Sequence, residues 1–324
     1  MSELALIERI ASRTALHPGT ALGIGDDAAI LDLGGPAVVT HDMLVEGVHF
    51  RRETCDARDL GAKAVAVNLS DLAAMGVVAV AVVVGLGLPP GFVQSGMADE
   101  LSAGIEEMAS AFAVTVAGGD VTSAATLVIG ITAIGRPQPG VPPVRRSGGR
   151  EGDLLCVTGR LGASAAGLAL LEHPALEARH PRRDALIGAH LRPEPRLDAG
   201  RALARAGVQA MMDLSDGLLL DAARLGRASG LRARIELDRV PVADGVGAVA
   251  AALGRDAAVM ATTGGEDYEL LAAVPPRLLD AARATLAIPL TVVGTLGAGE
   301  PGAELCDAGG GIVTVDSPGW EHDV

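Results

Sequence analysis

Residues 77–88, VVAVAVVVGLGL, lie within an uncharged stretch that extends from residue 72 to residue 98. A helix that crosses a membrane needs about 20 uninterrupted apolar residues. Here Gly76 is placed to end a helix, and the pair Pro89–Pro90 ends the valine-rich run. Buried strands of α/β proteins are continuous apolar runs of this kind. The stretch therefore predicts a buried strand and not a membrane span.

Further strands and helices are expected on both sides of this strand, and residues 137–149, rich in Pro, Gly and Arg, are typical of a linker. We therefore predict an α/β (α+β) chain with two domains, 1–140 and 141–324, each with strands and helices. The other expected strands are 28–33, 36–41, 113–117, 126–135, 154–158, 231–237, 270–274 and 290–294, and the expected helices are 3–14, 57–75, 95–111, 162–172, 183–190, 197–206, 217–228, 243–254 and 276–285.

The charge balance and the cysteines limit the class of protein. A formal net charge of −14 disfavours nucleic acid as a partner and suits a protein that binds cations. The three cysteines, Cys55, Cys156 and Cys306, lie far apart and without metal-ligand spacing. This pattern favours reduced thiols in the cytoplasm. The first residues, MSELALIERIASR, predict an amphipathic helix and do not resemble a signal peptide.

Aspartates recur where apolar neighbours predict partial burial, as in GIGDDAAIL at 23–31. Each taken alone is explained by a helix cap or a turn, where Asp is favoured. So many carboxylates at the ends of buried elements also suit Mg²⁺, which prefers carboxylates, water and substrate phosphates. Both interpretations remain open for each residue. The set comprises Asp26, Asp27, Asp42, Asp71, Asp120, Asp213 and Asp216.

A phosphate-bearing substrate is a natural partner for such a metal site, although no Walker A loop is present. The only lysine is Lys63, in the context GAKA, so the GxxxxGK[ST] pattern cannot occur. Main-chain N–H groups of Gly118 and Gly119 could instead meet phosphate oxygens. Arg145 and Arg146 could add guanidinium contacts, or form a solvated basic loop.

The order of motifs along nearly the whole chain resembles the thiamine-monophosphate kinase family of the aminoimidazole-ribonucleotide synthetase superfamily. Each motif alone is weak, and the ordered set is specific. The tail Gly319–His322 is similar to a terminal aromatic motif of that family, although Asp323 stands where a Phe is usual. The matching stretches are GIGDDAAIL (23–31), THDMLVEGVHF (40–50), KAVAVNLSDLAAMG (63–76), GGDVT (118–122), RRSGGREGD (145–153), VTGRLGASAAGLALL (157–171), HLRPEPRL (190–197), MDLSDGLLLDAARL (212–225) and GGEDYELL (264–271).

The resemblance implies a role for each matching residue. It implies magnesium binding by carboxylates, with Thr40 and His41 offering oxygens from one strand end; the family more often has a hydroxyl residue at position 41. The metal set is Asp27, Thr40, His41, Asp42, Asp71, Asp120, Asp213 and Asp216; the ATP set is Gly119, Asp120, Arg146 and Ser215; the thiamine monophosphate set is His49, Glu266 and Trp320.

The resemblance also implies a fold and a reaction. The first domain would have a mixed sheet with helices, and the second would be an α/β domain with its own sheet. Domain 1–140 would bind ATP and Mg²⁺ and form a homodimer, and domain 141–324 would complete the nucleotide and substrate site. The γ-phosphate of ATP would pass directly and in line to thiamine monophosphate, giving thiamine diphosphate, the last step of its biosynthesis. The nucleophile is an ionised phosphate, so no general base is assigned. The alternatives are a sister enzyme of the superfamily, a non-catalytic nucleotide-binding regulator, and a structural protein whose aspartates cap helices.

Overall fold

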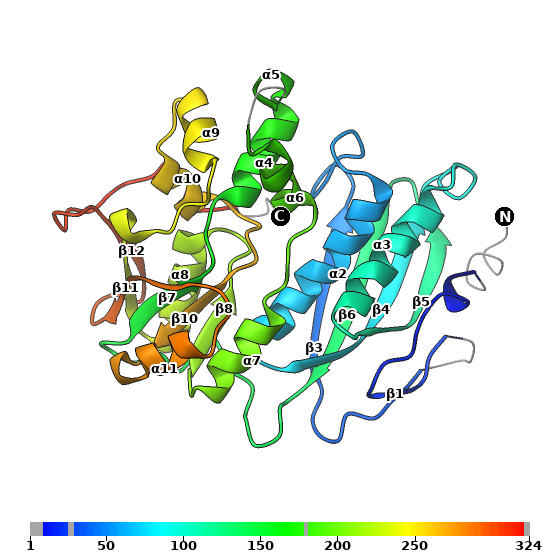
Figure 1. The fold of residues 1–324 in the computed structure, drawn as a ribbon, viewed down its shortest axis with the longest axis horizontal. Coiled ribbons are helices and arrows are strands. Elements are labelled where there is room, and N and C mark those ends of the chain that lie inside the picture. Colours follow the sequence, from blue (N-terminus) through cyan, green and yellow to red (C-terminus); the bar gives the residue numbers. More distant parts are fainter. Residues whose placement is uncertain (1–8, 25–28, 178–180, 321–324) are drawn as a thin grey trace. The chain divides into compact units, whose positions relative to one another are not determined.

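The computed structural model describes residues 9–24, 29–177 and 181–320. The chain divides into two compact units (Figure 1). The N-terminal unit comprises Met1–Leu72 and Val77–Pro139, and the C-terminal unit comprises Ala73–Gly76 and Gly140–Val324. Each unit is built on its own sheet.

The N-terminal unit contains a four-stranded sheet in the order β3-β6-β4-β5. Strand β4 pairs with β5 in parallel and with β6 antiparallel, and β6 pairs with β3 antiparallel, so the sheet is mixed as predicted. A short β1–β2 pair completes the strands described in this unit. The bounds are β1 Thr20–Leu22, β2 Ile30–Leu31, β3 Val38–Val45, β4 Val78–Leu88, β5 Thr115–Ser123 and β6 Val128–Arg136.

Two helices, α2 (Ala57–Ala74) and α3 (Met97–Ala111), cover one face of this sheet (Figure 1). They approach each other closely because glycine stands at the contact on both helices. A Cβ atom on Gly61 would lie 2.1 Å from the Leu101 carbonyl oxygen, and one on Gly104 would lie 1.9 Å from that of Arg58. The close approach fixes α2 against the sheet, and with it the polar side chains that α2 carries.

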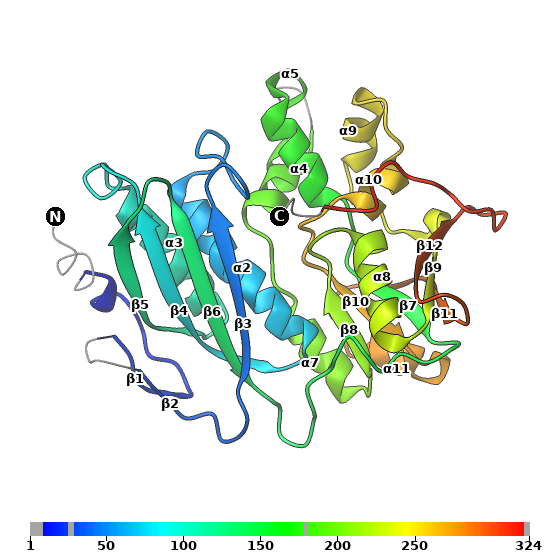
Figure 2. The ribbon, with the colours of Figure 1, turned by 180° about the vertical axis from the view of Figure 1, so that it is seen from behind.

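The opposite face of the sheet carries no helix of the described chain (Figure 2). Apolar side chains are exposed on it: Val39 is 58% exposed and Met43 49% exposed, both on β3, and Val83 on β4 is 37% exposed. The period-two alternation of β3 puts Thr40 and Asp42 on the other side from these residues. We call this surface the open face.

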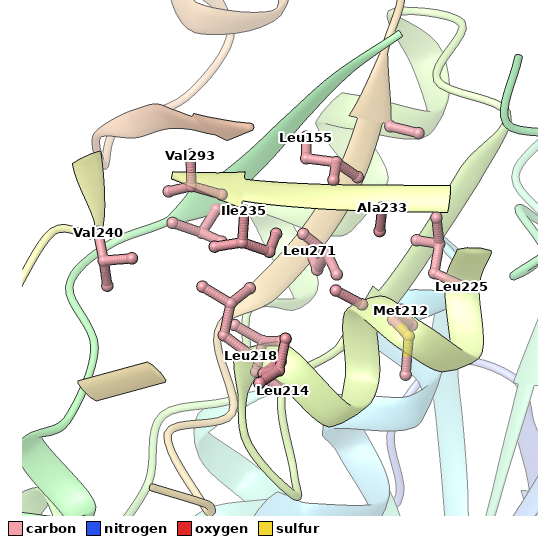
Figure 3. Close-up of a cluster of buried hydrophobic side chains, with 14 of the residues drawn as sticks. Leu155, Met212, Leu214, Leu218, Leu225, Ala233, Ile235, Val240, Leu271 and Val293 are labelled. Atoms are coloured by element: carbon pink, nitrogen blue, oxygen red, sulfur yellow. The ribbon is translucent and has the colours of Figure 1, made fainter. Parts of the chain in front are cut away.

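The C-terminal unit has a six-stranded sheet in the order β12-β9-β11-β7-β10-β8. Only the pair β12–β9 at one edge is parallel. Apolar side chains of these strands pack against Leu218 and Leu225 of helix α8 to form the main core (Figure 3). The bounds are β7 Leu154–Thr158, β8 Ala210–Asp213, α8 Leu218–Ser229, β9 Arg232–Glu236, β10 Leu270–Val274, β11 Leu290–Gly297 and β12 Gly302–Cys306.

A second apolar cluster of the C-terminal unit forms among helices α4, α6, α9 and α10. Helix α6 packs on α4 at Gly167, where a Cβ atom would lie 2.1 Å from the Leu186 carbonyl oxygen. The bounds of the helices are α4 Ala163–Glu172, α5 Pro174–Glu177, α6 Arg183–Leu191, α7 Leu197–Arg205, α9 Val246–Ala252, α10 Ala257–Thr263 and α11 Leu279–Ala284, and the 3₁₀ turns are η1 Leu237–Arg239 and η2 Pro276–Leu278.

The valine-rich run predicted as a buried strand is β4, and most of its side chains are buried. None of the helices in the described ranges combines the length and apolarity needed to cross a membrane. Cys55, Cys156 and Cys306 are buried thiols without a disulfide, as predicted. The expected helix at 3–14 falls largely on residues outside the described ranges.

Candidate functional site

The first polar cluster lies between strand β3 and helix α2 of the N-terminal unit. The Thr40 hydroxyl donates a short hydrogen bond to Oδ2 of Asp71. Because β3 is an edge strand, some of its main-chain N–H groups point away from β6, and that of Asp42 donates to Oδ1 of Asn68 at 3.0 Å. Asn68 and Asp71 are three residues apart on α2 and share one helix face. These four residues form what we call the β3–α2 cluster.

His41 does not direct its ring toward this cluster. Its Nδ1 lies 2.9 Å from the Thr132 hydroxyl on the neighbouring strand β6. His41 and Thr132 are cross-strand partners, and alternation puts both on the open face. The imidazole therefore lies on the other side of β3 from Asp71.

Gly119 and Asp120 lie on β5, three strands away from β3. The register aligns Asp42 with Ile131, Ile131 with Val84, and Val84 with Gly119 in one row across the sheet. With about 4.8 Å between neighbouring strands, the ends of this row are about 14 Å apart. Asp42 and Asp120 are thus too far apart to bind one metal ion together.

His49 lies in the turn that follows β3. The main-chain N–H of Val45 donates to Nδ1 of His49 at 3.0 Å, and the N–H of His49 donates to the Val45 carbonyl at 2.9 Å. Because Nδ1 accepts a hydrogen bond, a neutral His49 carries its proton on Nε2. Nε2–H is therefore the group with which this imidazole can donate to a phosphate.

The second polar cluster surrounds the loop between β8 and α8 of the C-terminal unit. One oxygen of Asp221, Oδ2, accepts the main-chain N–H groups of Ser215 at 3.1 Å and of Asp216 at 3.0 Å. Arg224, one turn further along α8, donates to Oδ1 of Asp221 at 2.7 Å and makes a shorter ion pair with Asp216. Asp213 is buried at the end of β8. These five residues form what we call the β8–α8 cluster.

Asp221 is fully buried, and burial raises its pKa to about 6. The amide hydrogen bonds and the Arg224 guanidinium oppose this increase. A buried carboxylate is retained only where such partners offset the cost of its desolvation. Asp221 therefore fixes the main chain of the loop on which Ser215 and Asp216 lie.

Glu266 and Trp320 meet the same loop through main-chain hydrogen bonds. The N–H of Glu266 donates to the Ser215 carbonyl at 2.7 Å, and that of Trp320 donates to the Asp216 carbonyl at 3.0 Å. A Cβ atom on Gly319 would lie 2.4 Å from that same Asp216 oxygen. Four of the predicted site residues, Ser215, Asp216, Glu266 and Trp320, are therefore brought together in one region of the C-terminal unit.

Arg146 is exposed and lies at the other end of β8. Its neighbour Arg145 forms an isolated β-bridge with Ala210, the first residue of β8. The Arg145 carbonyl accepts a hydrogen bond from the N–H of Met211 at 2.9 Å. At about 3.3 Å per residue, Ala210 and Asp213 are about 10 Å apart along the strand. The structure thus separates Arg146 from Ser215 within this unit.

The described carboxylates do not form a complete cage for a divalent cation. Among the described residues, no three His, Cys, Asp or Glu side chains lie close enough together to hold a metal ion. Asp27, which we predicted as a ligand, lies outside the described ranges. Mg²⁺ is commonly bound by one or two carboxylates together with substrate phosphates, not by a cage of protein ligands. The oxygen donors Thr40, Asp42 and Asp71 fit that kind of partial site.

Asn68, Asp221 and Arg224 had not been predicted as members of the site. A signal for each is present in the sequence. Asn68 precedes Asp71 by three residues in an otherwise apolar helix, and Asp221 precedes Arg224 by three residues directly after a run of leucines. Polar pairs at this spacing share a helix face, and a carboxylate among leucines needs a buried partner.

Both parts of the chain match models of the AIR synthase related protein, the N-terminal domain at residues 25–136 and the C-terminal domain at 150–306. This match places the chain in the class of AIR synthase related proteins.

Curated relatives and solved structures identify the family within this class. The curated thiamine-monophosphate kinase of Mycobacterium tuberculosis (strain CDC 1551 / Oshkosh) is 41% identical over 277 residues, 84% of this chain and 80% of that protein. The crystal structure of thiamine-monophosphate kinase from Stenotrophomonas maltophilia K279a superposes with a TM-score of 0.81 at 36% identity, covering 94% of this chain and 96% of that one. AaThiL, complexed with AMPPCP and TMP, gives a TM-score of 0.78 at 29% identity over 98% and 95% of the two chains. The chain belongs to the thiamine-monophosphate kinase family.

Proposed function

We propose that this protein transfers the γ-phosphate of ATP to thiamine monophosphate and produces thiamine diphosphate and ADP. The observation that carries the proposal is the joining of Ser215, Asp216, Glu266 and Trp320 by main-chain hydrogen bonds in a chain 41% identical to a thiamine-monophosphate kinase. A relative binds both AMPPCP and TMP, in line with these two substrates.

The β3–α2 and β8–α8 clusters are proposed to bind Mg²⁺, together with Asp27 and, for a separate ion, Asp120. When bound, Mg²⁺ would neutralise phosphate charge that no P-loop lysine is present to meet. The proposed ligands are Asp27, Thr40, Asp42, Asp71, Asp120, Asp213 and Asp216, with residue 41 contributing through its main chain because its ring faces Thr132.

The remaining residues have proposed roles in holding the two substrates. Gly119, Asp120, Arg146 and Ser215 contact ATP in this proposal. His49 donates from Nε2–H to the substrate phosphate, because Nδ1 already accepts from Val45. Glu266 faces the positively charged thiazolium ring, and the indole of Trp320, which is 45% exposed, stacks on a ring of the substrate.

In the proposed reaction, a terminal oxygen of the thiamine monophosphate phosphate attacks the γ-phosphorus of ATP in line. The new P–O bond forms as the bond to the β-phosphate oxygen of ATP breaks, and ADP leaves. An ionised phosphate oxygen needs no general base, so the contribution of the protein is positioning and neutralisation of charge.

We further propose that two copies of the chain pair through the open face. Val39, Met43 and Val83 expose apolar side chains on a sheet face that no described helix covers. Exposed apolar side chains on an uncovered sheet face are typical of protein–protein contacts. In this arrangement domain 1–140 binds ATP and Mg²⁺ and forms the dimer, and domain 141–324 completes the nucleotide and substrate site.

The test is a direct assay with purified protein, ATP, Mg²⁺ and thiamine monophosphate, in which thiamine diphosphate is followed after oxidation to its fluorescent thiochrome. We expect product that requires Mg²⁺ and is lost in Asp216→Asn. Asp244→Asn, a change at an exposed ion pair with Arg160, is the matched control and retains activity. Absence of product from the unmodified protein while ATP still binds would overturn the proposal in favour of a sister enzyme. Net retention of configuration at the γ-phosphorus would exclude direct transfer.

A further inference from the structure

Two sequence motifs that are far apart in the chain lie against each other in the C-terminal unit. HLRPEPRL (190–197) begins at the end of helix α6, and GGEDYELL (264–271) forms the turn before β10 together with the first residues of that strand. His190 and Arg196 of the first motif contact Glu266 and Glu269 of the second. The first motif has no role in the function proposed above.

The turn at Glu266 is held in an unusual backbone conformation. Glu266 has a φ of 64° and Tyr268 a φ of 50°, both in the left-handed region that non-glycine residues rarely adopt. Such conformations persist only where the surrounding structure enforces them, and they are frequent at functional sites. The N–H groups of both residues are bonded, to the carbonyls of Ser215 at 2.7 Å and Leu214 at 2.9 Å.

Asp267, between these two residues, directs its side chain into the protein. Its Oδ2 accepts the N–H of Gly162 at 2.7 Å and its Oδ1 accepts the N–H of Ser164 at 3.2 Å, at the start of helix α4. Glu269 is held by Arg196, whose Nη2 lies 2.7 Å from Oε1 and whose Nε lies 3.0 Å from Oε2. The main chain on both sides of Glu266 is thereby fixed.

His190 holds the side chain of Glu266 itself. Its Nδ1 lies 3.3 Å from Oε2 of Glu266 and 3.0 Å from the Ser164 hydroxyl. The imidazole side chain is only 9% exposed, whereas the Glu266 side chain is 29% exposed. Because α6 packs closely on α4 at Gly167, the position of the imidazole is set by the helix pair. Glu266 is thus a partly exposed carboxylate, and the buried imidazole of His190 determines the direction in which its side chain points.

We propose that His190 is a positioning residue that aims the Glu266 carboxylate at the cationic ring of the substrate. The buried imidazole and the carboxylate together make the site select a cationic heterocycle over a neutral one of the same shape. This inference rests on the proposed function, and it adds the residue and the physical basis for ring selection. A carboxylate held in one direction gains more from a fixed positive charge than one that must be ordered on binding.

The test compares thiamine monophosphate with its neutral thiophene analogue, in which carbon replaces the charged ring nitrogen. We expect Glu266→Gln to remove most of the preference for the cationic substrate. His190→Gln is expected to raise KM for thiamine monophosphate roughly 10-fold, with kcat and KM for ATP little changed. His190→Asn is expected to remain close to the unmodified enzyme, because the polar end of an Asn amide lies near the position of Nδ1, within reach of Glu266 and Ser164. The polar end of a Gln amide lies nearer the position of Nε2.

A double-mutant cycle separates positioning from a general structural role. In the Glu266→Gln background, His190→Gln is expected to have no further effect on KM for thiamine monophosphate. His173→Gln, at the exposed end of α4, is the control for a histidine outside the contact. The inference is overturned if His190→Gln and His190→Asn behave alike, or if the effect of His190→Gln persists without the Glu266 carboxylate. Production of thiamine diphosphate with unaltered ring preference in Glu266→Gln would refute the inference alone, whereas no product from the unmodified protein would refute the proposed function.

Discussion

The β3–α2 cluster and the β8–α8 cluster differ in the partners of their carboxylates. In the N-terminal unit, Asp71 accepts from the hydroxyl of Thr40, and Asn68 contributes an uncharged amide. In the C-terminal unit, the guanidinium of Arg224 lies between Asp216 and Asp221. The described contacts of the first cluster are therefore with neutral groups, whereas those of the second include a guanidinium.

This difference has a consequence for cation binding. A cation that approaches Asp216 competes with Arg224, while the described contacts of Asp71 involve a neutral hydroxyl. Carboxylates opposed by a guanidinium gain less from a metal ion, because part of their charge is already compensated. We therefore expect the β8–α8 cluster to bind Mg²⁺ more strongly once the Arg224 guanidinium is removed.

Asp71→Asn, which keeps the shape of the side chain and removes its charge, is expected to have the largest effect of the variants that follow. Catalysis should decrease by at least about 100-fold if Asp71 is the metal ligand proposed above, because metal and phosphate positioning then lose a charged oxygen donor. The measurement is thiamine diphosphate formation together with a thermal unfolding curve with and without Mg²⁺. Asp56→Asn is the matched control, since it makes the same change where α2 begins and retains an acceptor for the Asp59 N–H. Equal loss in both variants would show that the charge of Asp71 has no special role.

Arg224→Met tests the other side of the comparison. Removing the guanidinium leaves the fully buried Asp221 without its cation, so the free energy of unfolding should decrease by about 3 kcal/mol near neutral pH. Saturating Mg²⁺ should restore more stability to this variant than to the unmodified protein, as the vacated position beside Asp216 becomes available. Urea unfolding with and without Mg²⁺ measures both quantities. Competition between Mg²⁺ and Arg224 is disproved if Mg²⁺ stabilises the variant and the unmodified protein to the same extent. In Arg224→Lys the stabilisation by Mg²⁺ should lie between those of the other two proteins.

A third kind of carboxylate is Asp267, to which main-chain N–H groups donate, in contrast to the hydroxyl of Thr40 and the guanidinium of Arg224 in the two clusters. Burial raises its pKa from 3.8 to about 7, against the opposing amide bonds. The folded state therefore binds a proton more tightly than the unfolded state, and this contribution to stability is lost as pH rises toward and through about 7. Between about pH 5 and pH 8 the unmodified protein should lose about 2 to 3 kcal/mol more than Asp267→Asn, which cannot ionise. Parallel pH profiles from urea unfolding would contradict this.

The smallest effect is expected at Trp320, whose main-chain N–H holds the Asp216 carbonyl. Trp320→Leu leaves that bond possible and removes the aromatic face, so KM for thiamine monophosphate should rise about three-fold with KM for ATP unchanged. Trp320→Phe should give an intermediate value, because a smaller ring still stacks. An increase in KM for ATP of the same size would indicate that the tail supports the Asp216 loop and not the substrate ring.

Elements with a clear apolar pattern could be predicted from the sequence. β7 and β10 lie at 154–158 and 270–274, the expected residues, because each is a continuous buried run between turn residues. β12, Gly302–Cys306, was missed since its sequence, GAELC, has neither alternation nor β-branched residues, and it forms only as the parallel partner of β9. Helix α10 was missed because a run of small residues beside a glycine turn shows no amphipathic period; its cap, Asp256, is evident only from the hydrogen bonds.

The candidate site shows the same limit. Residue type and local context select the carboxylates as candidates, and their roles stay predictions. The structure brings Ser215, Asp216, Glu266 and Trp320 together through main-chain hydrogen bonds. His190, Asn68 and Arg224 act through partners set by tertiary packing, and periodicity alone gives no information on those partners. Alternation along β3 puts His41 and Thr40 on opposite faces of the sheet. Which of these faces the helices cover is evident only from the structure.

The alternation along β3 also has a consequence for how the gene can change. Codons 39, 41 and 43 specify side chains of the open face, so each can be replaced without turning Thr40 or Asp42 away from α2. Loss or gain of a single codon within the strand is different, since a shift of one residue exchanges the two faces for every residue beyond it. Natural variants of this segment are therefore expected to differ by substitution and to keep its length constant.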